Sequence, residues 1–325
     1  MMKKSLVKTT MILSRNIDMH PFPAGLTFEA SSEVEKIMIS AIESVEDEID
    51  IKYLVGMEES DKEALLHEGV ITYPMMLNRI HSSAIVVNDD FLYRLNDEDH
   101  LECVASTYDS NLMGLWAWLN DKEERLAPKL NFAYDAKLGY LTSRITEIGT
   151  GLKIHAVLHL PAIVKTGYLE KLFRAVHQVG YSIRAYGFGA DNQQEGFFEL
   201  SNSVTIGKTE TELVEGINEL IDRIEKKEAD ALETLVSAQN KVLEDELFRA
   251  YGVLKYARLL TQSEAVQLLS KVRLGAVLGH FKGLSIEEID RLLFNMAGIG
   301  VQNQFGRKED ASRAAYIRAH LYEHQ

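Results

Sequence analysis

Acidic residues gather in one short stretch of this chain, residues 96–102, which contains Asp97, Glu98, Asp99 and Glu102. Four carboxylates within seven residues can hold a metal cation, a guanidinium or a proton, because each of these needs concentrated negative charge. Taken alone, an acidic turn of this kind is most often a solvated loop. The stretch therefore needs accompanying motifs before it indicates a site.

Histidine, cysteine and glycine give weaker signals. His155 and His159 lie on one predicted strand at a separation of about 13 Å, so they cannot share a metal ion and no metal site is predicted. Cys103 is the single cysteine, which excludes an intrachain disulfide and is expected to be a small buried apolar residue. Residues 207–209, Gly-Lys-Thr, resemble the end of a P-loop, but Asn202 stands where that loop requires an earlier glycine.

The composition predicts a compact cytoplasmic protein. A chain of 325 residues is long enough for two domains. Its formal net charge of −14 argues against binding to nucleic acid or to an anionic membrane, since both need a basic surface. The sequence contains no run of about 18 apolar residues, so no membrane span is predicted, and a single cysteine favours a reducing compartment.

The elements that must position these residues change in character along the chain. Residues 32–69 follow a helical pattern, and so do residues 101–127 and 166–179. Strands are predicted from short runs rich in β-branched and aromatic residues at 82–87, 91–95, 140–143, 153–160, 181–188 and 197–206. This order predicts an α+β fold, with a mostly antiparallel sheet flanked by helices.

From Thr209 onward the chain is expected to be almost wholly helical, and capping boxes at Thr261 and Ser285 predict two of the helix starts. The sequence is expected to form three parts: an N-terminal segment with a small helical subdomain at 1–80, the α+β domain at 81–250 and an all-helical domain at 251–325.

Further motifs accompany the acidic stretch. Residues 137–143 read Lys-Leu-Gly-Tyr-Leu-Thr-Ser, residues 149–153 read Gly-Thr-Gly-Leu-Lys, and residues 157–161 read Val-Leu-His-Leu-Pro. With residues 96–102, they resemble the ATP:guanido phosphotransferases, whose signature is Asn-Glu-Glu-Asp-His-x-Arg. The chain therefore resembles the family of the creatine and arginine kinases and the bacterial protein-arginine kinases.

The C-terminal part narrows this resemblance. Residues 251–254, 272–275 and 312–315 are similar to the helical tail of the bacterial protein-arginine kinases, which the creatine kinases do not share. The likeness extends over nearly the whole chain, and it implies a guanido-kinase fold followed by a helical dimerisation domain, with a homodimer expected.

The resemblance also implies a reaction. The family transfers the γ-phosphoryl group of MgATP to a guanidinium nitrogen, which needs cations around the phosphates and carboxylates that hold the guanidinium and accept its proton. The family's catalytic base falls on Glu98. Its second guanidinium-binding glutamate falls on Asp191, whose side chain is one methylene shorter. ATP with Mg²⁺ is the cofactor expected of an active member, and none is expected otherwise.

Several arginines that bind the nucleotide phosphates in the family are replaced in this chain. Its opening Ser-Ser-Arg-x-Arg aligns with residues 8–12, so that Thr10 and Ile12 stand in place of two arginines. The arginine that closes the signature is Glu102. Unit charges about 4 Å apart interact by about 4 kcal/mol at an effective dielectric constant near 20, so these losses together weaken phosphate binding substantially.

Three basic residues remain as candidates for nucleotide binding. Arg184 stands where the family has an arginine. Lys153 replaces an arginine, keeping the charge but losing the bidentate fork. Arg144 stands where active members have a reactive cysteine.

The tail of the bacterial subfamily carries a phosphoarginine pocket around Arg-Asp-x-x-Arg-Ala-Ala. Here that motif begins at Glu309 instead of arginine, whereas Asp310 and Arg313 are kept. These two residues suit a guanidinium and a phosphate respectively, so they are the candidates for phosphoarginine binding.

Three functional hypotheses follow. The first is a pseudokinase or regulatory subunit that recognises arginine or phosphoarginine on proteins in bacterial protein quality control, with a Clp-type ATPase, a kinase activator or an active paralogue as partner. The second is an active protein-arginine kinase whose phosphate site is rebuilt from Lys153, Arg184 and Arg144, with Arg15 or Lys8. The third is a scaffold whose pockets are all vestigial.

Overall fold

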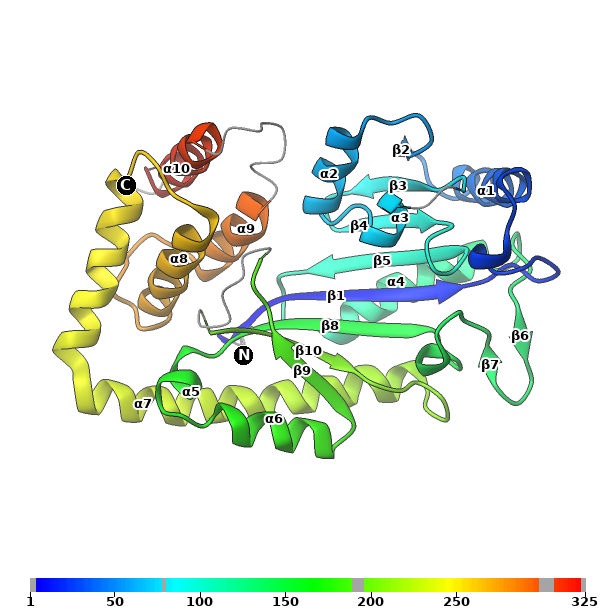
Figure 1. Cartoon of the computed structure of the whole chain (residues 1–325). Coiled ribbons are helices and arrows are strands. Elements are labelled where there is room, and N and C mark those ends of the chain that lie inside the picture. Colours follow the sequence, from blue (N-terminus) through cyan, green and yellow to red (C-terminus); the bar gives the residue numbers. More distant parts are fainter. Residues whose placement is uncertain (1–3, 78–79, 189–195, 298–306, 323–325) are drawn as a thin grey trace. The chain divides into compact units, whose positions relative to one another are not determined.

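The computed structural model describes residues 4–77, 80–188, 196–297 and 307–322 (Figure 1). The chain forms two compact units. Unit 1 comprises residues 1–8, 156–200 and 219–325, and unit 2 comprises residues 9–155 and 201–218.

The main sheet has eight strands in the order β2-β3-β4-β5-β1-β8-β10-β9. The strands are β1 (Leu6–Arg15), β2 (Asp50–Tyr53), β3 (Ser83–Asn88), β4 (Phe91–Leu95), β5 (Leu101–Thr107), β8 (Leu152–His159), β9 (Tyr181–Ala185) and β10 (Phe197–Asn202). A separate hairpin pairs β6 (Tyr134–Asp135) with β7 (Gly139–Tyr140). In unit 2, β2, β3, β4, β5 and β1 pair antiparallel in succession.

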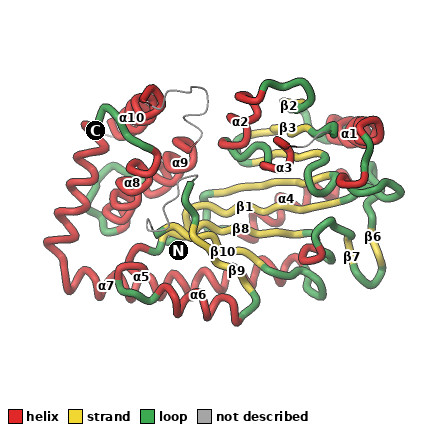
Figure 2. Tube along the Cα trace, in the orientation of Figure 1, coloured by secondary structure: helices red, strands yellow, loops and turns green. Residues whose placement is uncertain are grey.

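The helices are α1 (Phe28–Glu43), α2 (Glu59–His67), α3 (Tyr73–Leu77), α4 (Leu112–Leu126), α5 (Pro161–Lys165), α6 (Leu169–Gln178), α7 (Glu210–Tyr256), α8 (Gln262–Val277), α9 (Ile286–Ala297) and α10 (Arg307–Tyr322). In unit 2, α4 packs against β5, and in unit 1, α6 packs against β9. Figure 2 shows that the described chain from α7 onward is helical. The α+β class and the all-helical C-terminal region are therefore confirmed.

Several predicted elements differ from the structure. The strand predicted at 140–143 is confined to β7, Gly139–Tyr140. The helix predicted at 101–127 is two elements, because residues 101–107 form β5, with Leu101 and Cys103 fully buried, and only residues 112–126 form a helix. The first five residues of β5 are all buried, including Glu102, which is paired with Arg94, so the strand lacks the alternation of buried and exposed positions that marks a half-buried strand. The helical run predicted at 32–69 is interrupted by β2 after α1 ends at Glu43.

Capping residues in the sequence predict the starts of two helices correctly. The hydroxyl of Thr261 accepts from the N–H of Glu264 at the start of α8. Ser285 and Glu288 form a reciprocal capping box before α9, with distances of 3.1 Å and 2.9 Å. Both predicted helix starts are thus confirmed, the second with its full capping box, and Cys103 is a free buried cysteine as expected.

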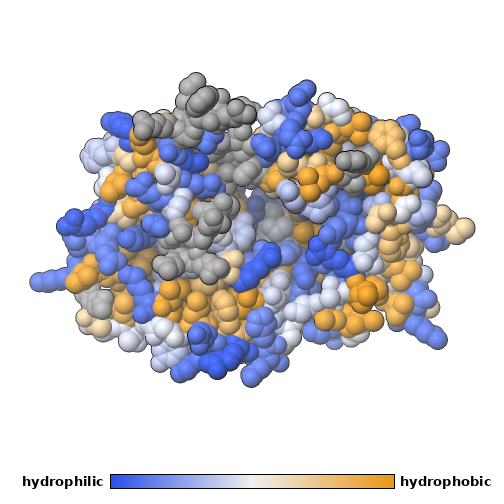
Figure 3. Space-filling view, in the orientation of Figure 1, coloured by the Kyte–Doolittle hydropathy of each residue, from blue (hydrophilic) through white to orange (hydrophobic). Residues whose placement is uncertain are grey.

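Unit 1 has a core of apolar side chains from α7, α8, α9 and α10, with Phe188 and Phe197 beside them. On the face in view, hydrophilic and apolar residues are interspersed (Figure 3). No helix within the described ranges combines the length and apolar character needed to cross a membrane.

Candidate functional site

A tight turn between β4 and β5 holds the acidic stretch in unit 2. The N–H of Asn96 donates to the carbonyl of His100 over 2.8 Å, and Asn96 has a φ of 53°, in the left-handed region that asparagine tolerates better than most residues. The Asn96 side-chain amide donates to the carbonyls of Ser31 and His81 over 3.0 and 2.7 Å. The turn is therefore anchored to the chain on both sides.

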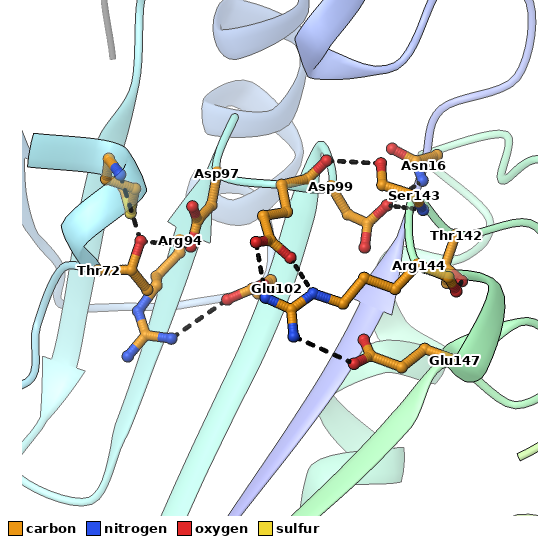
Figure 4. Close-up of polar contacts among 12 residues, drawn as sticks. Asn16, Thr72, Arg94, Asp97, Asp99, Glu102, Thr142, Ser143, Arg144 and Glu147 are labelled. Atoms are coloured by element: carbon orange, nitrogen blue, oxygen red, sulfur yellow. Dashed lines mark hydrogen bonds and ion pairs between the residues drawn. The ribbon is translucent and has the colours of Figure 1, made fainter. Parts of the chain in front are cut away.

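The Asp99 carboxylate ties this turn to the loop at residues 142–144 (Figure 4). One oxygen, Oδ1, accepts from the Asn16 side-chain amide over 2.5 Å and from the Ser143 N–H over 2.7 Å. The Ser143 hydroxyl donates to the Glu98 carbonyl over 2.7 Å. Asp99 and Ser143 thus fix the backbone position of Glu98 against the loop that carries Arg144.

His100 is a structural residue of the turn. Its Nδ1 accepts from the N–H of Ile17 over 3.0 Å, so its Nε2 carries the proton and donates to the carbonyl of Pro21 over 3.0 Å. Burial lowers the pKa of His100 to about 4. The imidazole is therefore neutral near pH 7 and has no free lone pair to accept a proton from a substrate.

The Glu98 carboxylate, predicted to be the base, contacts the guanidinium of Arg144. Both Glu98 oxygens are engaged: Arg144 Nη2 lies 2.6 Å from Oε1, and Arg144 Nε donates to Oε2. Arg144 Nη1 lies 3.9 Å from a Glu147 oxygen (Figure 4). The structure therefore brings together two of the predicted site residues, Glu98 and Arg144, and adds Glu147, which sequence reasoning missed.

Glu102 is paired with a cation that the sequence analysis did not consider. Arg94 lies directly opposite Glu102 in the β4–β5 register, and its Nη1 is 3.2 Å from Glu102 Oε2. The other Arg94 nitrogens donate to the carbonyls of Val70 and Gly69. The detectable signal in the sequence was the hairpin spacing, which places residues 94 and 102 side by side.

Burial raises the pKa values of two carboxyl groups at this position, Glu102 and Asp97. Burial raises the pKa of Glu102 to about 7, with the charge of Arg94 acting in the opposite direction. Burial also raises the pKa of Asp97, whose Oδ2 accepts from the Thr72 hydroxyl over 2.8 Å. Arg94 is therefore held among carboxyl and carbonyl groups and is not free for a phosphate.

Where β1 and β5 pair, neither strand carries a cation on the face that holds Thr10 and Ile12. Lys8, two residues before Thr10, lies on β1 before this paired stretch begins. The register pairs Thr10 with Ser106, Ile12 with Val104, and Ser14 with Glu102, and directly paired side chains lie on one face of a sheet. The Thr10 and Ser106 hydroxyls are 3.0 Å apart. The stretch of β1 that aligns with the family's nucleotide arginines is thus lined by hydroxyl and apolar groups.

Two further basic residues considered for the rebuilt phosphate site are engaged elsewhere. Arg15 is 2% exposed; its Nε is 2.7 Å from Glu123 Oε1, and its guanidinium carbon lies 3.5 Å from the centre of the Tyr140 ring. Lys8 belongs to unit 1, where its ammonium lies 4.8 Å from the centre of the Phe294 ring. Arg15 is therefore part of the packed interior of unit 2.

The remaining candidates for nucleotide binding are placed in different units. In unit 2, Lys153 Nζ donates to the carbonyl of Asn202 over 2.7 Å. In unit 1, Arg184 Nη2 is 2.8 Å from Glu199 Oε1, and its side chain is 71% exposed. Asp191, the predicted guanidinium clamp, lies outside the described residues.

The tail candidates contact each other. Arg313 Nη1 donates to Asp310 Oδ1 over 3.0 Å and to the carbonyl of Leu260 over 2.8 Å. The Arg313 side chain is 5% exposed and that of Asp310 is 26% exposed. The pair therefore links α10 to the turn before α8.

In the parts of the chain that the structure describes, no group of three or more His, Cys, Asp and Glu side chains is arranged to hold a metal ion.

Family comparisons match both parts of the chain. Residues 33–231 match the ATP:guanido phosphotransferase C-terminal catalytic domain. Residues 240–325 match the protein-arginine kinase McsB C-terminal domain.

Two curated proteins illustrate the similarity. A protein-arginine kinase of Symbiobacterium thermophilum is 30% identical over 325 residues, covering 95% of this chain and 91% of that protein. A protein-arginine kinase of Caldanaerobacter subterraneus subsp. tengcongensis is 29% identical over 334 residues, covering 98% of this chain and 97% of that protein.

Solved structures show the same fold. The crystal structure of lombricine kinase matches with a TM-score of 0.63 and 19% identity, covering 71% of this chain and 68% of that one. The duplicated taurocyamine kinase from Schistosoma mansoni, solved with bound transition state analog components, matches with a TM-score of 0.62 and 20% identity. The match covers 69% of this chain and 33% of that duplicated one.

Proposed function

The chain belongs to the ATP:guanido phosphotransferase family, on the protein-arginine kinase branch, and from that premise we propose that it is a regulatory member or pseudokinase that recognises arginine or phosphoarginine on proteins. Its carboxylates for a guanidinium are kept, whereas most of its cations for a triphosphate are lost. The family as a whole uses ATP, so the proposed loss of nucleotide binding applies to this chain and not to its relatives.

The observation that carries the proposal is the β1–β5 face. Thr10 and Ile12 offer no positive charge there, and Arg94, on β4 beside β5, is held by Glu102 and two carbonyls. A nucleotide triphosphate carries several negative charges that must be balanced by cations for binding and for phosphoryl transfer. The lack of cations at Thr10 and Ile12 therefore supports the proposal.

The proposed setting follows from the relatives. We place the protein in the bacterial cytoplasm, as a homodimer formed through residues 251–325, acting on arginine- or phosphoarginine-bearing proteins. A Clp-type ATPase, a kinase activator or an active paralogue is the partner class that this role requires. We also propose that the chain has three functional parts, at residues 1–80, 81–250 and 251–325.

Thermal denaturation with MgADP and with phosphoarginine tests the proposal. Ligand that binds the native state alone raises the melting temperature by mass action. We expect no shift with MgADP and a positive shift with phosphoarginine that is lost in Asp310→Ala. A clear shift with MgADP, abolished in Arg184→Ala, would contradict the pseudokinase.

A second candidate is an active protein-arginine kinase. It is favoured by the retained Glu98 carboxylate, which is one-third exposed, and by the largely exposed Arg184. Incubation with γ-labelled ATP and an arginine-rich protein separates the two: acid-labile label in the wild type, absent in Glu98→Gln, establishes catalysis. Absence of label at high enzyme concentration supports the regulatory role.

A further inference from the structure

The guanidinium of Arg144 lies between two carboxylates. It makes two parallel contacts to Glu98 and a longer one, 3.9 Å, to Glu147. Parallel contacts to both oxygens of a carboxylate are the geometry by which an arginine fork is recognised. Arg144 thus stands where an arginine side chain from another protein would have to bind in order to reach Glu98.

The two carboxylates differ in exposure, and the backbone of both residues is anchored independently of the Arg144 guanidinium. The Glu147 side chain is 9% exposed and that of Glu98 is 33% exposed. Glu98 is held through its carbonyl by Ser143, and Glu147 through its own backbone, whose N–H donates to the Arg144 carbonyl and whose carbonyl accepts from Gly151. Neither backbone anchor uses the guanidinium.

The Arg144 side chain is free to leave without disturbing its backbone. The Arg144 carbonyl accepts from the Thr142 hydroxyl over 2.8 Å and from the Glu147 N–H over 2.9 Å. The side chain itself is 57% exposed, so rotation about its bonds carries the guanidinium into solvent. What remains is a pair of carboxylates with a charge of about −2 when both are ionised.

We propose that Glu98 and Glu147 form a guanidinium-binding site that Arg144 fills from within the same chain, so that an arginine of a partner protein binds only after Arg144 leaves. The inference rests on the proposed recognition of arginine and adds a second carboxylate, Glu147, and a built-in competitor. Planar guanidinium is the preferred ligand over ammonium, because only the fork matches two oxygens of Glu98 at once.

Population arithmetic sets the expected effect. Ion pairs with this much exposure favour the closed form only modestly, on the order of two- to fivefold. A ligand that needs the open form has its apparent affinity reduced by the open fraction. Removing Arg144 therefore tightens binding of an external guanidinium by about three- to sixfold.

The test uses Nα-acetyl-arginine amide as the probe and isothermal titration of the full chain. Arg144→Ala should bind the probe about three- to sixfold more tightly than the wild type, and adding Glu98→Gln or Glu147→Gln should remove the gain. Nα-acetyl-lysine amide should gain less than the arginine probe. Arg223→Ala is the matched control, since it also removes one arginine from an exposed ion pair, with Glu219, and should leave the affinity unchanged.

Equal affinity in the wild type and in Arg144→Ala would overturn the inference. If Glu98→Gln in the wild-type background still weakens binding, the proposed arginine recognition stands although the internal competitor does not. If no variant binds the probe, the inference fails, and the phosphoarginine melting experiment decides the proposed function separately. Arg144→Gln repeats the test with a side chain closer in length, and a wild-type melting curve for each variant establishes that it is folded.

Discussion

Glu102 forms a buried ion pair with Arg94. Taken from the sequence, Glu102 is a charge reversal at a phosphate-binding position. In the structure it is half of a buried ion pair, with side-chain exposures of 10% for Arg94 and 11% for Glu102. The positive charge of Arg94 lies against the carboxyl group of Glu102, and Arg94 is therefore not available to bind a phosphate.

Removing one partner should be far more harmful than removing both. Arg94→Met leaves Glu102 buried without its cation, and we expect a loss of about 3 kcal/mol in the free energy of unfolding at pH 8. Arg94→Met/Glu102→Met replaces both with apolar groups and should recover a large part of that loss, because no buried charge remains. Urea denaturation of the wild type, both single variants and the double variant measures the coupling, expected at about 1–3 kcal/mol.

Additive effects in this cycle would contradict a direct interaction. They would mean that Arg94 acts mainly through its bonds to the carbonyls of Val70 and Gly69. The Arg94→Met variant and the double variant lose these bonds equally.

At the scale of elements, β1 decides whether the face can hold phosphates. Its residues alternate between buried and half-buried positions, and Thr10 and Ile12 are both half-buried on the side that pairs with Ser106 and Val104. Side chains at these positions are therefore accessible from one face of the sheet, and longer ones can extend into solvent.

Restoring cations on this strand should restore nucleotide binding. Thr10→Arg/Ile12→Arg adds two guanidinium groups, and hydrogen bonds to charged groups contribute about 1.5–3 kcal/mol each. We expect MgADP affinity to rise at least tenfold, measured by titration calorimetry or by the thermal shift.

The control for net charge is Glu215→Gln/Glu244→Gln, which also makes the protein two units more positive but on exposed positions of α7. This variant should show no gain. Equal gains in both variants would mean that bulk charge, and not the β1 face, limits nucleotide binding.

The elements themselves show which parts of the fold the sequence predicts. Capping at Thr261 and Ser285 follows from local hydrogen bonding, which the sequence displays directly, and both starts were predicted. β5 was not, since its first five residues are all buried, the acidic Glu102 among them, and only a short segment separates it from α4.

The site shows a similar division. Motif spacing selected Glu98 and Arg144, but not that they contact each other, because 46 residues separate them. Arg94 and Glu147 were missed: the first depends on strand register, and the second on a turn that brings it beside Arg144. Side-chain pairing across distant segments follows from tertiary packing, which no local pattern records.

For the whole molecule, buried ionisable groups link stability to pH. Glu228 in unit 1 accepts from the N–H groups of Ala162 and Ile163 over 2.8 and 2.9 Å at the start of α5. Burial raises its pKa from 4.5 to about 7. The native state therefore binds this proton more tightly than the unfolded state does.

The consequence is a loss of stability as pH rises. Between pH 4.5 and about 7 the native state holds more protons at Glu228 than the unfolded chain, so the free energy of unfolding decreases as pH increases through that window. Burial of Asp290, whose pKa is raised to about 6, acts in the same direction. His100 acts oppositely, because its pKa is lowered to about 4 and the unfolded state binds the extra proton.

Because these contributions oppose one another, the wild-type curve alone does not isolate Glu228, and the difference between two proteins does. We expect the stability of the wild type relative to Glu228→Gln, measured by urea denaturation, to fall by about 3 kcal/mol between pH 5 and pH 8.5. Glutamine keeps the size and one acceptor oxygen for α5 but cannot ionise, so its curve lacks this contribution. Glu215→Gln, at an exposed position, should track the wild type throughout. Parallel curves for the wild type and Glu228→Gln would mean that water or a nearby cation stabilises the ionised carboxylate as well in the folded chain as in the unfolded one.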